Sequence, residues 1–117
     1  MIESGKPLHE KKESNLILKQ AVSDCEIEAA MRLRFEVFNL ELNEGLQESY
    51  LSGLDTDDYD LYCDHIIVKD SSSDRVVGTY RLLPGSRAEN GIGYYSENEF
   101  EMSSFKKLPG EKLELGR

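Results

Sequence analysis

Residues 55–84, DTDDYDLYCDHIIVKDSSSDRVVGTYRLLP, join an acidic segment to two apolar runs that a short polar turn separates. The runs 65–70 (HIIVKD) and 75–83 (RVVGTYRLL) are rich in the β-branched and aromatic residues that favour strands. Residues 71–74 (SSSD) between them are few and polar, as is typical of a tight turn. We therefore predict an antiparallel hairpin here.

Arg81 is a charged residue inside the second predicted strand. Strand alternation places Val77, Thr79, Arg81 and Leu83 on one face, and Val76, Gly78, Tyr80 and Leu82 on the other. Arg81 thus lies between apolar neighbours in a strand that is apolar on both sides. Because an unpaired buried guanidinium is costly, we expect a carboxylate beside it.

The segment 44–64 carries carboxylates in unusual number. Its aspartates are Asp55, Asp57, Asp58, Asp60 and Asp64. Their spacing does not fit a calcium loop, because the required glycine and closing glutamate are absent. A solvated acidic loop is the simplest interpretation of such a charge run. The interleaved Tyr59, Leu61 and Tyr62 instead indicate a loop that packs against the body of the domain.

Upstream, residues 15–22 (NLILKQAV) predict a first strand, and Ser23 with Glu26 fits a capping box that opens a helix over 23–43. The polar side of this helix is expected to hold Glu28, Arg32, Glu36 and Asn39. Arg34 interrupts the apolar stripe, so it either forms a structural ion pair or faces a ligand. Both interpretations stay open at this point.

Downstream, residues 84–93 predict a loop and 94–108 a short helix or turns. The run 112–117 (KLELGR) predicts a strand that enters the core, with its leucines on one face and Glu114 and Gly116 on the other. A core strand as the last element indicates a sheet that is truncated after ELGR.

Length and composition fit one domain over 15–117 with a polar, flexible tail over 1–14. The net charge of −9 argues against nucleic acid as a partner and suits a small cationic or zwitterionic ligand. Two separate cysteines indicate reduced thiols, and two histidines argue against a zinc site. Because no apolar run approaches the roughly 20 residues of a membrane span, we expect a cytoplasmic protein.

These motifs resemble the N-terminal half of the GNAT-fold acyltransferases grouped with the ornithine N-acyltransferases and hemolysin-family proteins. The resemblance spans roughly 15–117 and is carried by LRFEVFNLEL (33–42), DDYDLYCDHIIV (57–68), VVGTYRLL (76–83), GYYSENEFEM (93–102) and LELGR (113–117). The acyl-homoserine-lactone synthases share a sparser form of the pattern. The resemblance implies an α+β fold, a GNAT-like α/β sandwich in which helices flank a mainly antiparallel sheet. The acyl-donor half of the family would follow the ELGR strand.

The resemblance also implies a reaction, in which a fatty acyl group passes from acyl carrier protein, or from acyl-CoA, to the α-amino group of ornithine. The product would be a lyso-ornithine lipid, and no permanently bound cofactor or metal is needed. The residues that match the family's substrate pocket are Arg34, Phe38, Asp57, Asp60, Arg81 and Arg117. Glu114 is the candidate catalytic base or ammonium orienter, and its alternative role is structural pairing with Arg81 or Arg34.

Two alternatives remain beside this interpretation. One is a homoserine-lactone-type synthase with S-adenosylmethionine as acceptor, and the other is a non-catalytic GNAT-like module whose charged cluster only stabilises the fold. Peripheral contact with the inner membrane is compatible with either enzyme. The sequence indicates neither an acyl chain length nor an oligomeric state.

Overall fold

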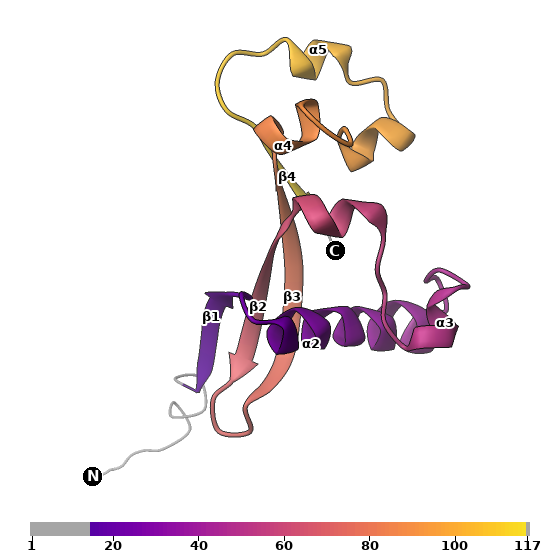
Figure 1. The fold of residues 1–117 in the computed structure, drawn as a ribbon, viewed down its shortest axis with the longest axis vertical. Helices are drawn as coiled ribbons and strands as arrows, with labels where there is room; N and C mark the ends of the chain where they lie inside the picture. Colours follow the sequence, from indigo (N-terminus) through magenta and orange to yellow (C-terminus); the bar gives the residue numbers. More distant parts are fainter. Residues whose placement is uncertain (1–14, 117) are drawn as a thin grey trace.

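The computed structural model describes residues 15–116, and both the predicted tail 1–14 and Arg117 lie outside the described residues. This part of the chain forms one sheet in the order β1-β2-β3-β4, and every neighbouring pair is antiparallel (Figure 1). The strands are β1 (Leu16–Gln20), β2 (Asp64–Asp70), β3 (Arg75–Pro84) and β4 (Leu113–Gly116). The predicted strands at 15–22, 65–70 and 75–83 are therefore confirmed, and so is the described part of the one at 112–117. The sheet and its helices match the predicted α+β class.

The central hairpin, β2 and β3, is the predicted one. The carboxylate of Asp70 stabilises the turn of this hairpin. It accepts one hydrogen bond from the backbone N–H of Ser72 at 3.1 Å and one from the Ser72 hydroxyl at 2.8 Å. Asp74 closes the turn in the left-handed region, at φ 60°. Short polar side chains are common in such turns because they bond to the nearby backbone.

A β-bulge changes the predicted faces at the start of β3. Val68 pairs with Gly78 and Lys69 pairs with Val76, so that Val77 is an extra residue. Val76 therefore turns to the apolar core, whereas Val77 is 48% exposed. The predicted alternation was wrong for these two valines, because a bulge cannot be read from the alternation pattern. It holds from Thr79 to Leu83, where Arg81 and Leu83 are buried on the same face.

Helix α2 (Asp24–Arg34) begins at Ser23, whose hydroxyl accepts a hydrogen bond from the N–H of Glu26 at 3.2 Å. The Glu26 carboxylate bonds to the N–H of Val22 at 3.1 Å, one residue before the predicted partner. Beyond Arg34 the chain continues as a π-helical segment, η1 (Phe35–Glu41). The predicted helix 23–43 is therefore one continuous helical stretch with two geometries.

The π-helical segment explains why the predicted polar face was wrong at Asn39. A wider turn changes which side chains face the body of the domain, so a pattern read at 3.6 residues per turn fails there. Asn39 is only 2% exposed, and its Nδ2 donates to the carbonyl of Leu46 at 2.8 Å. The hydroxyl of Tyr50 donates to the Asn39 carbonyl at 3.0 Å. These bonds fasten the chain after η1 back onto it.

The main apolar core lies between α2 and the sheet, on the face that the helix crosses (Figure 1). It is formed by Ala21, Ala30 and Ile67, with Ile27 and Val76 packed against them. Ala30 and Ile67 have no exposed surface, since the small alanine lets the helix approach the strands closely. This contact fixes the end of α2, and with it Arg34, over the middle of the sheet.

Short helical turns lie in the predicted loops 44–64 and 84–93, and two more confirm the short helix or turns predicted over 94–108. They are α3 (Ser49–Ser52), η2 (Asp58–Tyr62), α4 (Gly85–Glu89), η3 (Tyr95–Asn98) and α5 (Ser103–Lys106). A second apolar cluster of Leu83, Ala88 and Tyr94, with Tyr59, Cys63 and Phe105 packed against it, joins η2 to the lobe that follows β3. The acidic loop is thus held to the body by Tyr59, as predicted, whereas Leu61 is 90% exposed and was wrongly assigned to that contact.

Strand β4 lies at the edge of the described sheet. The prediction that it enters the core was wrong for its leucines, since Leu113 is 52% exposed and Leu115 is 68% exposed. Glu114 and Gly116 alternate with them and face the side that carries α2 and Arg81. Among residues 15–116, no helix has the length and apolar character needed to cross a membrane.

Candidate active site

Arg34 ends helix α2 and is buried, with 2% of its surface exposed. Its Nε donates to Oδ2 of Asp55 at 2.9 Å, and its Nη2 donates to the Asp55 carbonyl at 2.7 Å. Nη1 and Nη2 also donate to the two carboxylate oxygens of Asp60, each at 2.9 Å. Burial alone would lower the pKa of Arg34, but Asp60 and Asp55 outweigh it and raise that pKa. The guanidinium therefore stays charged in the interior.

Arg81, in β3, is 4% exposed and bonds to the same group of acids. Its Nη1 donates to Oδ1 of Asp57 at 2.7 Å and to Oδ1 of Asp60 at 2.8 Å, and its Nη2 donates to Oδ2 of Asp57 at 3.0 Å. Burial opposes its charge, yet Asp57 and Asp60 raise the pKa of Arg81 well above the ordinary arginine value. The carboxylate expected beside Arg81 is therefore confirmed, and Arg34 also meets carboxylates, as its structural interpretation required.

Turn η2 presents two of the acids together. Asp57 caps this turn by accepting a hydrogen bond from the N–H of Tyr59 at 3.0 Å, while Oδ2 of Asp60 accepts from the N–H of Asp57 at 2.8 Å. Burial would raise the pKa of Asp60, but Arg34, the Asp57 N–H and Arg81 outweigh it and lower that pKa. We call the set Arg34, Asp55, Asp57, Asp60 and Arg81 the Arg–Asp network.

Two contacts outside the sequence prediction fix the acids in place. The N–H of Asp55 donates to the carbonyl of Met31 in α2 at 3.0 Å. Nε2 of His65, which is 5% exposed, lies 3.1 Å from the carbonyl of Asp60. Since a carbonyl only accepts, Nε2 carries the proton in this bond.

With three carboxylates against two guanidinium groups, the network has a formal charge of −1.

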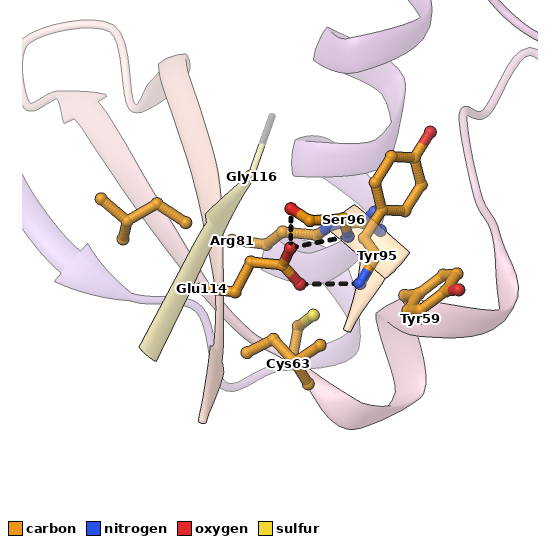
Figure 2. A pocket seen from close by; sticks show the side chains of 9 residues that line it. Tyr59, Cys63, Arg81, Tyr95, Ser96, Glu114 and Gly116 are labelled. Atoms are coloured by element: carbon orange, nitrogen blue, oxygen red, sulfur yellow. Dashed lines mark hydrogen bonds between the residues drawn. The ribbon is translucent and has the colours of Figure 1, made fainter. Parts of the chain in front are cut away.

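Arg81 also lines a pocket of about 100 Å³ at the end of the network (Figure 2). Its other lining residues are Tyr59, Cys63, Leu83, Tyr95, Ser96, Glu114, Leu115 and Gly116. The rings of Tyr59 and Tyr95 lie 5.9 and 5.6 Å from Cζ of Arg81, within cation–π range. The pocket thus combines a fixed cation, a carboxylate and two aromatic rings.

Glu114 lies in this pocket, but its partners are not the predicted ones. Its Oε1 accepts a hydrogen bond from the N–H of Tyr95 at 2.8 Å, and its Oε2 accepts from the N–H of Ser96 at 2.8 Å. The Ser96 hydroxyl also donates to Oε2 (Figure 2). The expected pairing of Glu114 with Arg81 or Arg34 was therefore wrong, because the carboxylate fastens the start of η3 instead. Its role as catalytic base or ammonium orienter stays a prediction.

The remaining predicted site residues do not line the pocket within 15–116. Arg34, Asp57 and Asp60 lie behind Arg81 in the network, and half-buried Phe38 belongs to the π-helical segment. Arg117 lies outside the described residues. For Arg34, these contacts fit the structural ion pair that the sequence left open against direct ligand contact.

Apart from Arg81 and Glu114, the lining residues were not predicted as site residues; they are Tyr59, Cys63, Leu83, Tyr95, Ser96, Leu115 and Gly116. The signals that could have found them are the aromatic residue inside the acidic loop and the polar-aromatic stretch 93–102. Cys63 is the only thiol among the lining residues, and burial raises its pKa above the ordinary value. The thiol is therefore protonated at neutral pH, which does not favour a role as nucleophile.

The antiparallel sheet, the helix across one face and the pocket at the edge strand are consistent with an α+β acyltransferase architecture. Residues 33–117 match the family described as acetyltransferase (GNAT) domain, and the chain belongs to this family. No solved structure matches the chain significantly.

Three curated relatives of the chain share one name, L-ornithine N(alpha)-acyltransferase. The protein of Rhizobium meliloti (strain 1021) is 38% identical over 112 residues, which cover 89% of this chain and 38% of the relative. The protein of Brucella abortus (strain 2308) is 35% identical over 113 residues, covering 88% and 40%. That of Agrobacterium fabrum (strain C58) is 38% identical over 105 residues, covering 83% and 36%. The chain thus spans about two fifths of the length of these relatives.

Proposed function

We propose that this chain forms the acceptor-binding part of an N-acyltransferase that transfers a fatty acyl group from a thioester to the α-amino group of ornithine. The observation that carries the proposal is the meeting of Glu114 and Arg81 in one small pocket, each held by other residues. Three relatives named L-ornithine N(alpha)-acyltransferase, similar over most of the chain, support ornithine as the acceptor. The product would be a lyso-ornithine lipid.

The proposed chemistry is direct aminolysis of the thioester. The neutral amine attacks the carbonyl carbon, the C–N bond forms, the C–S bond breaks, and the sulfur leaves as a thiol after it takes up a proton. The amine must first lose its proton, and a carboxylate close to it can orient the ammonium or accept that proton. The negative charge that develops on the carbonyl oxygen is best stabilised by backbone N–H groups.

The hydrogen bonds of Glu114 leave its carboxylate able to bind the ammonium group of an acceptor. A carboxylate offers about four acceptor positions. Three of them are occupied, by the backbone N–H of Tyr95 and by the backbone N–H and the hydroxyl of Ser96. Within residues 15–116 one position remains for a donor from the pocket. In this proposal Glu114 holds the α-ammonium toward the thioester, and its three protein bonds keep it in a fixed orientation.

The acyl donor is proposed to be acyl carrier protein, with acyl-CoA as the alternative. Lys106, Lys107 and Lys112 are basic residues of the segment between η3 and β4. Lys106 already pairs with Glu97 at 2.7 Å, and Lys112 lies 3.9 Å from Glu89. Of these three lysines, only Lys107 has no carboxylate within salt-bridge distance among residues 15–116. Peripheral contact with a membrane would follow from a lipid product and belongs to the same proposal.

The alternatives predict different acceptors. A homoserine-lactone-type synthase needs room for S-adenosylmethionine, whereas a pocket of about 100 Å³ suits the head group of an amino acid. The stretch GYYSENEFEM, which supplies Tyr95 and Ser96 to the pocket, also favours the ornithine acceptor. A non-catalytic module would need the Arg–Asp network alone and would leave the pocket without a role.

A chimera tests the proposal. The matched segment of the Rhizobium meliloti relative is replaced by residues 1–117 of this chain, and the purified protein is supplied with an acyl carrier thioester and either L-ornithine or S-adenosylmethionine. We expect thiol release and N-acylornithine with L-ornithine. Glu114→Gln should lower this rate at least tenfold, whereas Glu111→Gln, at an exposed glutamate on the approach to β4, should not.

Two results would contradict the proposal. Thiol release that depends on S-adenosylmethionine would favour the homoserine-lactone-type reaction. A folded chimera without activity toward either acceptor would favour the non-catalytic module, provided that circular dichroism and the melting temperature match those of the parent enzyme.

A further inference from the structure

Arg81 has unused hydrogen-bonding capacity on the side of the pocket. A guanidinium carries five N–H donors. The two on Nη1 and one on Nη2 bond to Asp57 and Asp60. The N–H of Nε and the second N–H of Nη2 have no acceptor among residues 15–116. These two donors share one edge of the planar group, which is the geometry that binds a carboxylate in a bidentate manner.

Gly116 leaves this edge open. It pairs with Arg81 across the β3–β4 ladder and lines the same pocket. A Cβ at position 116 would lie 3.4 Å from Nε of Arg81 and 3.5 Å from its Cγ. Any larger residue would therefore cover the Nε–H, whereas glycine leaves room for a ligand oxygen to reach it.

The pocket supplies a complementary group for an amine. Glu114 is two residues before Gly116 on the same face of β4, and both residues line the pocket with Arg81 (Figure 2). Among the described residues, three donors occupy the Glu114 carboxylate, which leaves one acceptor position for a ligand. An α-amino acid presents an ammonium and a carboxylate on one carbon, so its head group can meet Glu114 and Arg81 together. The cavity of about 100 Å³ has room for a group the size of an amino-acid head group.

We propose that the Nε/Nη2 edge of Arg81 binds the α-carboxylate of the acceptor, so that the site requires a free α-amino acid and rejects amines, esters and amides. This inference rests on the proposed function, because it assigns the acceptor to this pocket. In this proposal the two edges of the Arg81 guanidinium group have different roles. One edge is neutralised by Asp57 and Asp60 and fixes the side chain, and the other presents a pre-oriented cation to the ligand.

Calorimetric titration of the chain tests the inference, with L-ornithine, L-ornithinamide and 1,4-diaminobutane as probes at up to millimolar concentrations. We expect L-ornithine to bind at least about tenfold more tightly than the other two, since they lose a charge-assisted bidentate contact. The comparison is stringent, because the network and Glu114 together carry a formal charge of −2, which favours the more cationic amide and diamine.

Gly116→Ala is the matched variant, since it covers Nε without changing any member of the Arg–Asp network. It should remove most of the preference for L-ornithine over its amide. Gly78→Ala is the control, because a Cβ there lies 3.5 Å from Val68, an ordinary contact, and Gly78 does not line the pocket. Arg81→Lys provides a second test if the folded protein persists, because an ammonium cannot bind two oxygens in a planar fork.

The outcomes separate this inference from the proposed function. Equal binding of L-ornithine and L-ornithinamide, or an unchanged preference in Gly116→Ala, overturns the carboxylate assignment while ornithine remains the acceptor. Preference for a different free amino acid, with the same discrimination against its amide, overturns ornithine but supports the role of Arg81. No binding by any probe overturns the inference, and the chimera assay then decides the reaction independently.

Discussion

Arg34 and Arg81 donate to the same oxygen, Oδ1 of Asp60, at 2.9 and 2.8 Å. One guanidinium comes from the end of α2 and the other from the middle of β3, and the shared acid comes from the short turn η2. This arrangement ties the helix, the sheet and the acidic segment together at one point. Because all three side chains are largely shielded from water, their interaction is only weakly screened by salt.

Asp60→Asn should therefore destabilise the fold strongly. The substitution keeps the shape of the side chain but removes the charge that both arginines share, and breaking a buried pair of this kind costs about 3–5 kcal/mol. Chemical denaturation should show this loss. Asp58→Asn, at an exposed acid in the same turn, should change the unfolding free energy by less than about 0.5 kcal/mol. Equal effects of the two substitutions would contradict the shared role of Asp60.

The ion pairs of Asp60 also lead us to expect that the stability of the fold depends on pH. The folded-state pKa of Asp60 lies below its ordinary value of 3.8. Stability from a depressed carboxyl pKa is fully present above the unfolded value, and it is lost as the pH falls through the folded value. The wild-type chain should thus lose stability below about pH 4 more steeply than Asp60→Asn.

Denaturation curves at several pH values measure the difference in acid sensitivity between the wild-type chain and Asp60→Asn. Recording them at high ionic strength reduces the contribution of exposed ion pairs. Salt screens the exposed Lys19–Glu26 pair, in which a hydrogen bond from Lys19 lowers the pKa of Glu26 to about 2. Parallel pH profiles for the wild-type chain and Asp60→Asn would show that Asp60 does not titrate with folding.

Much of this architecture follows from local patterns. The hairpin was predicted because two β-rich runs flank a polar turn, and Arg81 was expected beside acids because a lone buried cation is costly. The aspartates were recognised as its partners because no other segment offers so many carboxylates. These features depend on residue type and spacing, which the sequence carries directly.

Other features depend on tertiary contacts that no local pattern contains. The π-helical segment reverses the expected exposure of Asn39, and the bulge exchanges Val76 and Val77. The bond partners of Glu114 were mispredicted because Tyr95 and Ser96 reach it from a segment 18 or 19 residues away in the chain. A charge-pairing argument favours arginine for such a glutamate, whereas here backbone N–H groups satisfy it.

Gly45→Ala tests the packing that follows the π-helical segment. A Cβ at Gly45 would overlap Oδ1 of Asn39, a short buried side chain that is already bonded to the carbonyl of Leu46. Because Asn39 has little room to move, we expect a loss of about 1–3 kcal/mol in unfolding free energy. Gly78→Ala, with only ordinary contacts, is the control. A Gly45→Ala protein as stable as this control would show that Asn39 is not held as described.

Glu114→Gln tests how the pocket wall is held. Glutamine keeps one acceptor oxygen where the carboxylate has two, so the N–H groups of Tyr95 and Ser96 cannot both keep their partners. Hydrogen exchange at these two amides should become at least about tenfold faster, which corresponds to the loss of one charge-assisted bond. Glu111→Gln should leave both rates unchanged. Unchanged exchange in Glu114→Gln would remove the argument that Glu114 fixes η3.

The central claim is that the end of the Arg–Asp network forms the floor of an acceptor pocket, and two-dimensional ¹H–¹⁵N NMR tests it most directly. The spectrum of the chain is recorded while L-ornithine is added, with the side-chain Nε–H of Arg81 observed together with the backbone amides. The account predicts saturable shifts at Arg81 Nε–H and at the amides of Tyr95, Ser96 and Gly116. Shifts confined to other parts of the chain, or no shift at any concentration, would contradict it.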